Sequence, residues 1–309
     1  MTEPIWERAT VVGCGLVGTS FGLALRRAGL CARVAGWDTD ASALEEALRL
    51  GAIEEVDAAF ASGGVSASDL VYLATPVGPV VEFLRAGARQ VGPGAVLTDA
   101  GSTKVEICRA ARALASEGRR FVGGHPIAGS HLRGPAHARA DLFEGAPYVL
   151  TPVEDGDALA LVMLEETLRR LGARVRVATA EEHDRALAFV SHLPQLASGA
   201  LAATVEALPD ADALRSISGT GFRDMTRLAE SSWAVWRDIL ATNSAEVADA
   251  LDAFIDRLSI VRDELRDGRL NLTSALFDHA RREHQTFTGR DKTQGNTGDS
   301  KGNDSRPQP

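Results

Sequence analysis

The feature that most constrains this chain is a glycine-rich turn between a short apolar strand and a helix near the N-terminus. Residues Ala9 to Gly18 read ATVVGCGLVG, in which the glycines follow the spacing GxGxxG. In such a unit Gly13 permits a tight turn, Gly15 lets the backbone approach a pyrophosphate, and Gly18 allows the helix to pack closely on the strand. The pyrophosphate then sits on the N-terminus of the helix, so Leu16 is also assigned to cofactor binding. The motif predicts a dinucleotide-binding βαβ unit.

A carboxylate follows the glycine motif at the spacing that a dinucleotide site requires. Asp38 stands 20 residues beyond Gly18, at the end of the next predicted strand. A carboxylate there accepts both ribose hydroxyls of NAD and repels the 2′-phosphate of NADP. The neighbouring Thr39 and Asp40 supply no arginine that would reverse this preference. The sequence therefore favours NAD, with an ordinary turn aspartate as the alternative.

Another predicted strand ends in the sequence Leu-Ala-Thr-Pro, at Thr75 and Pro76. In open α/β folds the dinucleotide lies at the carboxyl edge of the sheet. We therefore expect these two residues to wall the nicotinamide ribose pocket, although a Thr-Pro pair at a strand end is also common turn chemistry.

The first 179 residues alternate short β-branched runs with longer Ala-, Leu- and Arg-rich stretches at helical spacing. Such alternation is typical of βαβ units and a parallel sheet. The predicted fold class is an α/β, Rossmann-type, doubly wound parallel sheet over residues 1–179. Strands are predicted at 8–12, 32–37, 70–74, 96–99, 120–123, 147–151 and 174–178, and helices at 18–28, 41–50, 77–90, 104–117 and 157–171.

From residue 180 onward the strand signal disappears, and an all-α C-terminal domain is predicted over residues 180–287. Pro194 should kink or split its first helix. Residues 186–205 are almost uncharged, which fits either a buried bundle core or a face that packs on a second subunit. Three long helices are predicted, at 181–208, 231–267 and 271–283.

The overall composition limits the partners and the location of the chain. Its 309 residues carry 33 Lys and Arg against 42 Asp and Glu, a net charge of −9, which argues against nucleic acid and anionic membranes. We find no signal peptide and no run of about 18 uncharged apolar residues. Three scattered cysteines predict neither a disulfide framework nor a metal site, and favour a cytoplasmic location. Residues 288–309 contain no aliphatic side chain and are predicted to be disordered.

Several further blocks carry polar residues that a core does not need. TDAGSTK and GGHPIAGS each follow a predicted strand, whereas SHLPQ and GTGFRDMTR lie in the helical half. Together with the glycine motif and a WRDI segment shortly before Asn243, these blocks in this order resemble the prephenate and arogenate dehydrogenases of tyrosine biosynthesis. The resemblance extends from about residue 9 to residue 287.

The resemblance implies an NAD-dependent oxidative decarboxylation, in which prephenate becomes 4-hydroxyphenylpyruvate. A neutral imidazole is suited to accept the proton of a hydroxyl that becomes a carbonyl, and this role is assigned to His125. Ser102 is expected to hydrogen-bond the same hydroxyl and the nicotinamide. The alternatives are a turn histidine at His125 and a helix N-cap at Ser102.

The expected substrate is a small dicarboxylate, so its pocket needs cationic and hydrogen-bonding groups. Arg227 matches the family's arginine that pairs with a substrate carboxylate. His192 matches a second histidine of the family pocket, although without the resemblance it would be interpreted as a hydrogen-bonded core residue. Trp236 matches an aromatic wall of the pocket and fits a core position equally well. Ser130 and Gln195 complete the predicted substrate site.

One position departs from the pattern of some relatives, which carry a glutamate after the Gly-Ser pair. This chain has His131 there, followed by Leu132 and Arg133. We hypothesise that His131 and Arg133 add positive potential at the mouth of the pocket in place of an acidic gate.

Three alternatives remain open at this point. Arogenate could replace prephenate as substrate, with discrimination by groups around His192, Gln195 and Thr220. A hydroxyacid or imino-acid dehydrogenase could share the architecture, although such enzymes lack the HPIAGS block. A non-catalytic NAD-binding interaction module would be expected to have lost His125 or Ser102. The resemblance also implies a homodimer formed through the helical domain and a monofunctional member of the family.

Overall fold

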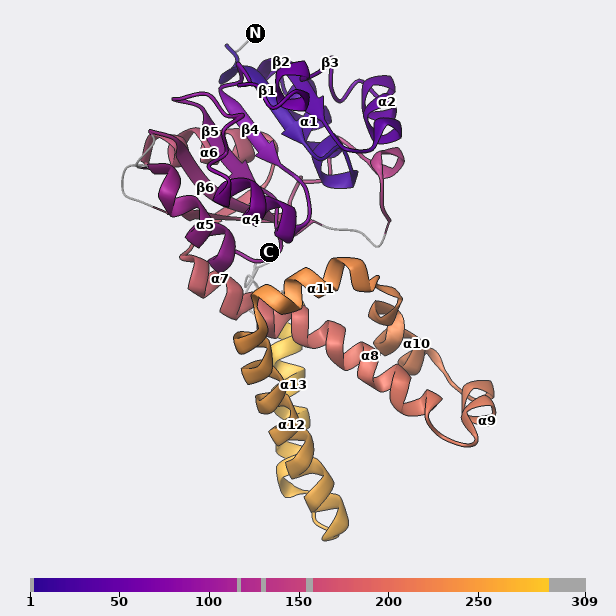
Figure 1. Cartoon of the computed structure of the whole chain (residues 1–309). Coiled ribbons are helices and arrows are strands. Elements are labelled where there is room, and N and C mark those ends of the chain that lie inside the picture. The colour runs from indigo at the N-terminus through magenta and orange to yellow at the C-terminus, as the bar shows by residue number, and fades with distance from the viewer. Residues whose placement is uncertain (1–2, 116–117, 129–131, 154–157, 289–309) are drawn as a thin grey trace, which may run out of the picture. The chain divides into compact units, whose positions relative to one another are not determined.

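The computed structural model of the chain describes residues 3–115, 118–128, 132–153 and 158–288. The chain divides into two compact units, residues 1–250 and residues 251–309. The first unit holds a sheet and the helices that cover it, followed by the first helices of the C-terminal half (Figure 1).

The N-terminal half of the first unit alternates strands and helices. In order they are β1 (Trp6–Val12), α1 (Leu16–Arg27), β2 (Cys31–Trp37), α2 (Ala41–Arg49), β3 (Glu55–Val56), α3 (Ala58–Ala61), β4 (Leu70–Leu73), α4 (Val77–Arg85), β5 (Val96–Asp99), α5 (Val105–Ala115), β6 (Arg120–Pro126), the 3-10 helix η1 (Pro135–His137), β7 (Pro147–Pro152), α6 (Ala158–Arg170) and β8 (Arg174–Val177). The seven predicted strands and five predicted helices all appear. The two-residue strand β3 and the one-turn helix α3 were not predicted.

The strands form one eight-stranded sheet in the order β3-β2-β1-β4-β5-β6-β7-β8. The strand order reverses between the parallel neighbours β1 and β4, which is the doubly wound topology that the sequence predicted. One pair corrects the expectation of a wholly parallel sheet, because β7 runs antiparallel to β6. In the described part of their connection only η1 is helical, whereas a parallel return requires a longer crossover, usually a helix.

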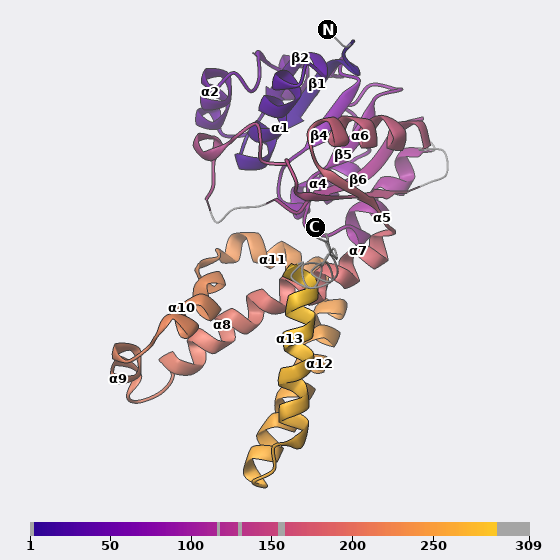
Figure 2. The ribbon, with the colours of Figure 1, turned by 180° about the vertical axis from the view of Figure 1, so that it is seen from behind.

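Both faces of the sheet are covered, as the two views show (Figures 1 and 2). Val11 belongs to the apolar core beneath α1 and α6, while its neighbour Val12 belongs to the core beneath α4 and α5. Tyr72 and Leu73 of β4 divide between the same two cores. Because successive side chains of a strand point to opposite faces, both faces of these strands must be apolar, which explains their continuous hydrophobic runs.

Helix α4 is shorter than the sequence predicted. It ends at Arg85 rather than near residue 90. Gly87 follows at φ +86°, a left-handed conformation that terminates helices. The apolar residues beyond Gly87 that suggested a longer helix, Ala88 and Val91, are buried in the turn that follows.

The helical half begins with α7 (Ala180–Leu187), whose start is fixed by a capping box between Thr179 and Glu182. The chain continues through a π-helical turn, Ala188–His192, into α8 (Leu193–Glu206). Pro194 lies in the first turn of α8 and has no N–H to donate to the preceding turn. The π-helical turn therefore lies where the sequence predicted that this proline would kink or split the helix. The elements that follow are α9 (Ala211–Ser216), α10 (Thr220–Thr226), the 3-10 helix η4 (Arg227–Glu230), α11 (Trp233–Thr242), α12 (Ser244–Arg266) and α13 (Asn271–Thr288).

The predicted helix over 231–267 is broken in two at Asn243. This residue has φ −129° and lies between α11 and α12. Its side chain donates to the carbonyl of Asp184 at 2.8 Å, so the break serves a contact with a distant helix. In the second unit, Glu264 accepts hydrogen bonds from the N–H groups of Leu272 and Thr273 at the start of α13. Residues 289–309, the predicted tail, lie outside the described part.

The apolar surface of the helical half remains largely uncovered within the single chain. Val190 is 73% exposed, Trp233 66% and Ile217 81%. By length and composition alone the helical segment Ala180–Glu206 could span a membrane, with 22% of the apolar window buried. The sequence criterion required about 18 consecutive apolar residues, and this segment does not meet it because polar Ser191, His192 and Gln195 interrupt the run. Core helices of water-soluble proteins pass the same test.

Candidate active site

The carboxyl ends of five adjacent parallel strands carry the predicted site residues. Along the sheet order β2, β1, β4, β5 and β6 they are Asp38, Gly13, Thr75, Ser102 and His125. Because these strands are parallel, their carboxyl ends meet at one edge of the sheet. The predicted cofactor residues therefore lie at the ends of β2, β1 and β4, and the two predicted catalytic residues at the ends of β5 and β6.

The glycine turn has the geometry that a close backbone approach requires. Gly13 has φ +95°, and a Cβ there would lie 2.6 Å from the carbonyl oxygen of Ala74. A Cβ at Gly18 would lie 1.9 Å from the oxygen of Gly13 and 2.9 Å from Val11. At Gly15 a Cβ would meet nothing within 4 Å. Two glycines thus permit the turn and the packing, and the third leaves open space that a pyrophosphate could occupy.

The remaining turn residues border the same loop. Leu16 is the first residue of α1, and its N-cap Gly15 has no side chain with which to cap the helix N-terminus. The methyl group of Thr75 lies 2.9 Å from the point where a Cβ of Gly13 would stand. Pro76 is the exposed N-cap of α4. The structure places Leu16 and Thr75 at the glycine turn, and Pro76 follows Thr75 at the start of α4.

Asp38 is bound to the glycine turn through the backbone. Its Oδ2 accepts a hydrogen bond from the N–H of Cys14 at 2.6 Å, and its Oδ1 accepts from the N–H of Asp40 at 2.9 Å. Burial and the negative charge of Asp38 raise the pKa of the Cys14 thiol to about 12. The thiol is therefore protonated at neutral pH.

Ser102 lies in the turn between β5 and α5, and it is partly exposed. Helix α5 begins at Val105, so the alternative of Ser102 as its N-cap is wrong. The N–H groups of Lys104 and Val105 are capped instead by Asp184, at 2.7 Å and 2.9 Å. Within the described residues the hydroxyl of Ser102 makes no hydrogen bond, which leaves it available to a substrate.

A buried ion pair holds the two loops that carry the catalytic candidates. Lys104 and Asp99 have fully buried side chains, and the ammonium group donates to Asp99 and to the carbonyl of Gly124 at 2.7 Å. Asp99 also accepts from the N–H of Gly101 at 2.7 Å and of Gly124 at 3.0 Å. One carboxylate thereby fixes the residues beside both Ser102 and His125.

His125 is the sixth residue of β6 and is 9% exposed. Burial disfavours the imidazolium form, and the neighbouring His183 and Lys104 disfavour it further, so the pKa of His125 lies well below its usual value. A histidine that stays neutral at neutral pH is able to accept a proton. Its Nδ1 lies 2.8 Å from Nε2 of His183, which places its other nitrogen opposite that contact.

His192 and Trp236 are brought together in the helical half. Their rings meet edge to face with centroids 5.7 Å apart. His192 is 1% exposed, and its Nδ1 lies 3.2 Å from Nδ2 of Asn243. Burial lowers the pKa of His192 to about 4. Because Asn243 donates to Nδ1, the neutral ring carries its proton on Nε2 and acts as a hydrogen-bond donor there.

Gln195 and Arg227 come from α8 and η4, which lie side by side. Gln195 uses both ends of its amide: Nε2 donates to the carbonyl of Leu228 at 2.7 Å, and Oε1 accepts from Ser231 at 3.1 Å. It thus fixes the residue next to Arg227. The Arg227 side chain is exposed and forms no ion pair within the described residues. Ser130 and His131 lie outside the described residues.

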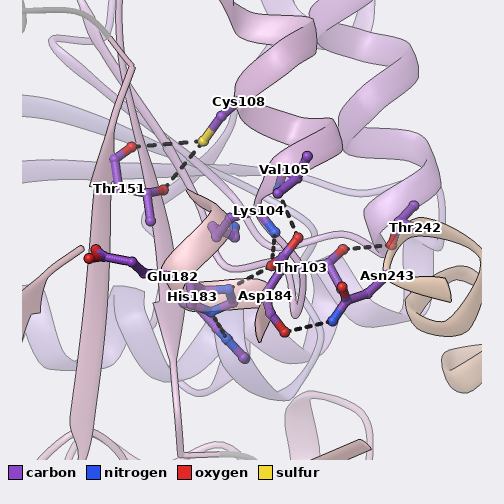
Figure 3. Close-up of polar contacts among 12 residues, drawn as sticks. Thr103, Lys104, Val105, Cys108, Thr151, Glu182, His183, Asp184, Thr242 and Asn243 are labelled. Carbon is purple, nitrogen blue, oxygen red and sulfur yellow. Dashed lines mark hydrogen bonds and ion pairs between the residues drawn. The ribbon is translucent and has the colours of Figure 1, made fainter. Parts of the chain in front are cut away.

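Helix α11 contacts the sheet edge at two points. Asp238 accepts from the N–H of Gly78 in α4 at 3.2 Å, and the hydroxyls of Thr103 and Thr242 are 2.7 Å apart (Figure 3). These contacts hold α11 against α4 and against the loop that carries Ser102. The helical half therefore contributes directly to the edge where the catalytic candidates lie.

Two family models cover most of the chain. One, described as the nucleotide-binding domain of prephenate dehydrogenase, matches residues 21–177, and the other, described as its dimerization domain, matches residues 179–279. The chain belongs to the prephenate dehydrogenase family. This confirms the resemblance read from the sequence blocks, and it makes the chain an oxidoreductase with a nucleotide-binding N-terminal half.

Individual members agree with this family. Prephenate dehydrogenase of Bacillus subtilis is 35% identical over 82% of this chain and 68% of that protein. A crystal structure of prephenate dehydrogenase from Aquifex aeolicus, in complex with hydroxyphenyl propionate and NAD+, is 29% identical with a TM-score of 0.84, and covers 91% of this chain and 98% of that one. Synechocystis arogenate dehydrogenase is 29% identical with a TM-score of 0.73, over 92% of this chain and 99% of that one.

His183 and Asp184 were not predicted as site residues, although both are buried. They share a helical face with Leu187 and Ala188, which are buried as well. An acidic residue and a histidine in phase with the apolar face of a helix could have been recognised as buried polar groups. Their partners in the sheet edge could not be read from the sequence.

Proposed function

We propose that this chain catalyses the NAD-dependent oxidative decarboxylation of prephenate to 4-hydroxyphenylpyruvate. The observation that carries the proposal is His125, a buried histidine with a lowered pKa at the end of β6, next in the sheet to β5, which Ser102 follows. A chain of the prephenate dehydrogenase family that keeps both groups has the base and the hydroxyl that the oxidation of an alcohol requires.

The cofactor site fits a dinucleotide. Gly13, Gly15 and Leu16 would hold the pyrophosphate, Asp38 the adenosine ribose, and Thr75 the nicotinamide side, and the open space at Gly15 supports this placement. When bound, NAD supplies the hydride acceptor of the reaction. The carboxylate of Asp38 and the lack of an arginine at the two residues that follow it favour NAD over NADP.

The reacting end of the substrate would lie between Ser102 and His125. His125 takes the proton of the ring hydroxyl at Nε2, and Ser102 orients that hydroxyl by a hydrogen bond. The departing carboxylate leaves as carbon dioxide while the ring becomes aromatic. No further acid is required of the protein for that loss.

The carboxylates of the substrate would be bound by the helical half. Arg227 offers a bidentate guanidinium group without a competing ion pair among the described residues, and His192 offers a neutral Nε2–H donor. Trp236 packs on His192 and closes the wall. Gln195 supports this site through Leu228; Ser130 and His131 remain proposed neighbours of the substrate.

Arogenate is the second candidate substrate, because arogenate dehydrogenase of Synechocystis covers nearly the same length. Cyclohexadienyl dehydrogenase of Zymomonas mobilis is also 28% identical over 84% of this chain and 88% of that protein. The two substrates differ only in the side chain that carries an amine or a ketone. The choice would rest on groups near His192, Gln195 and Thr220.

We further propose a homodimer formed through the helical half. The family's dimerization domain matches residues 179–279, and the exposed apolar residues Val190, Ile217 and Trp233 belong to that part. We place the functional boundary near residue 180, with nucleotide binding before it and substrate binding after it. The cytoplasmic location is supported by three buried thiols, all unpaired.

The proposal is tested by incubating the protein with NAD and either prephenate or arogenate and following the absorbance of the reduced cofactor. We expect reduction with prephenate and a higher kcat/KM for prephenate than for arogenate. A higher value for arogenate would reassign the substrate. No reduction with either would contradict the function, while binding of NAD without turnover would favour a non-catalytic module.

A further inference from the structure

A buried chain of hydrogen bonds leads away from the rear of His125. Its Nδ1 lies 2.8 Å from Nε2 of His183, and Nδ1 of His183 lies 2.7 Å from Oδ1 of Asp184. His183 is 2% exposed and Asp184 1% exposed. Both come from α7, whereas His125 comes from β6, 58 residues earlier than His183.

The direction of each bond follows from the partners of Asp184. Its two oxygens already accept from the N–H groups of Lys104 and Val105 (Figure 3), so the carboxylate is an acceptor and Nδ1 of His183 must donate to it. In neutral His183 the remaining nitrogen, Nε2, then has a lone pair and no proton. The contact with His125 therefore requires that Nδ1 of His125 donates.

Because Nδ1 of neutral His125 carries the proton, the unprotonated nitrogen with the free lone pair is Nε2. Burial lowers the pKa values of both His125 and His183, so both rings are neutral at neutral pH. The other charged groups that influence His183 are Lys104 and Asp99, which pair with each other. The tautomer of His125 is thus set by the chain behind it and not by the solvent.

We propose that His183 and Asp184 are positioning residues that hold His125 in the tautomer with Nε2 unprotonated and free to accept a proton. The inference rests on the proposed role of His125 as the base. Asp184 serves the site twice, because the same carboxylate caps α5 directly after the loop of Ser102. Its carbonyl also receives Asn243, the partner of His192. One residue therefore ties together the three parts of the site.

The first test compares two substitutions of His183. His183→Leu removes the acceptor, whereas in His183→Gln the side-chain Oε1 can still accept from Nδ1 of His125. We expect His183→Leu to lower kcat about a hundredfold, with the KM for prephenate and the Kd for NAD changed less than threefold. The kcat of His183→Gln should be at least tenfold higher than that of His183→Leu. The exposed His284 provides a matched control as His284→Leu, with wild-type kcat.

Equal losses of kcat in the Leu and Gln variants, or a loss carried mainly by KM or by NAD affinity, would show that His183 does not act through the tautomer of His125. Circular dichroism verifies that each variant is folded.

The second test needs neither activity nor a variant. Long-range proton–nitrogen NMR of the wild-type protein labelled with ¹⁵N-histidine distinguishes a ring protonated at Nδ1 from one protonated at Nε2. We expect His125 to carry its proton on Nδ1 at pH 7.5. A proton on Nε2 would overturn the inference. If the wild type reduced NAD with neither substrate, the proposed function would fail while this measurement would still decide the tautomer.

Discussion

The carboxylate of Asp38 accepts a hydrogen bond from the backbone N–H of Cys14 at 2.6 Å, within the glycine turn. The end of β2 is thereby tied to the loop that follows β1. One oxygen of Asp38 is held by the turn and the other by Asp40, so the negative charge is fixed at the place where the ribose of a dinucleotide would lie.

This geometry predicts the cofactor preference. Asp38→Asn removes the charge that repels a 2′-phosphate and weakens the acceptor for the ribose hydroxyls. We expect the KM for NAD to rise about tenfold and the ratio of kcat/KM for NADP over NAD to increase. Asp40→Asn is the matched control, because Asn caps a helix about as well as Asp, and Asp40 caps α2. An unchanged cofactor ratio in Asp38→Asn would contradict the assignment.

The buried pair of Lys104 and Asp99 predicts a strong and non-additive effect on stability. Lys104→Met leaves the carboxylate of Asp99 buried without its cation, which costs about 3–5 kcal/mol of unfolding free energy. The double variant Lys104→Met, Asp99→Asn removes both charges and should cost less than Lys104→Met alone. Urea denaturation measures both. A double variant at least as unstable as the single one would show that charge burial is not the dominant cost.

The depressed pKa of His192 predicts a loss of stability in acid. Above pH 6.5 the ring is neutral in both the folded and the unfolded chain, so it does not affect the pH dependence. As the pH falls from about 6.5 to about 4, only the unfolded state gains the proton, because the folded pKa is about 4. The resulting loss of unfolding free energy is about 3 kcal/mol at most.

His192→Gln should remove that part of the acid sensitivity. Unfolding free energies of the two proteins, measured between pH 7 and pH 4, should converge toward low pH. His125 and His183 also have lowered pKa values, so the variant will keep some pH dependence. Parallel curves over the whole interval would mean that His192 is not responsible.

Arg227 is predicted to act in substrate binding. Arg227→Ala should raise the KM for prephenate about tenfold to a hundredfold and leave kcat within a fewfold, because a carboxylate contact far from the reacting carbon binds substrate and transition state alike. Arg223 is exposed on α10, and Arg223→Ala is the matched control with an unchanged KM. If Arg227→Ala lowered kcat and left KM unchanged, Arg227 would act in the chemical step instead.

The parts of the molecule that depend on local chemistry were predictable from the sequence. Gly13 and Gly18 are required by the turn and packing they create, and the spacing of Asp38 from them follows from one βα unit. The strand ends that carry Ser102 and His125 were found because polar residues followed apolar runs. These motifs depend on residues that are close in the sequence, so they can be recognised without the three-dimensional structure.

The contacts that were missed join distant segments. Asp184 lies 79 residues from Val105, whose N–H it caps, and no local pattern reports such a partner. Asn243 interrupts a helical pattern for a contact 59 residues away. The antiparallel direction of β7 was not predicted for a related reason, because a strand that is buried on both faces is an apolar run whichever way it points.

His125 is the proposed base of the reaction, and the substitution His125→Asn tests this role. Asparagine fills much of the imidazole volume and can still accept a hydrogen bond, but it cannot hold the proton. We predict that kcat with prephenate falls by roughly 10²–10⁴, while the Kd for NAD, measured by fluorescence titration, stays within about twofold. A variant that keeps wild-type kcat would contradict the central claim, as would one whose loss is explained by NAD binding alone.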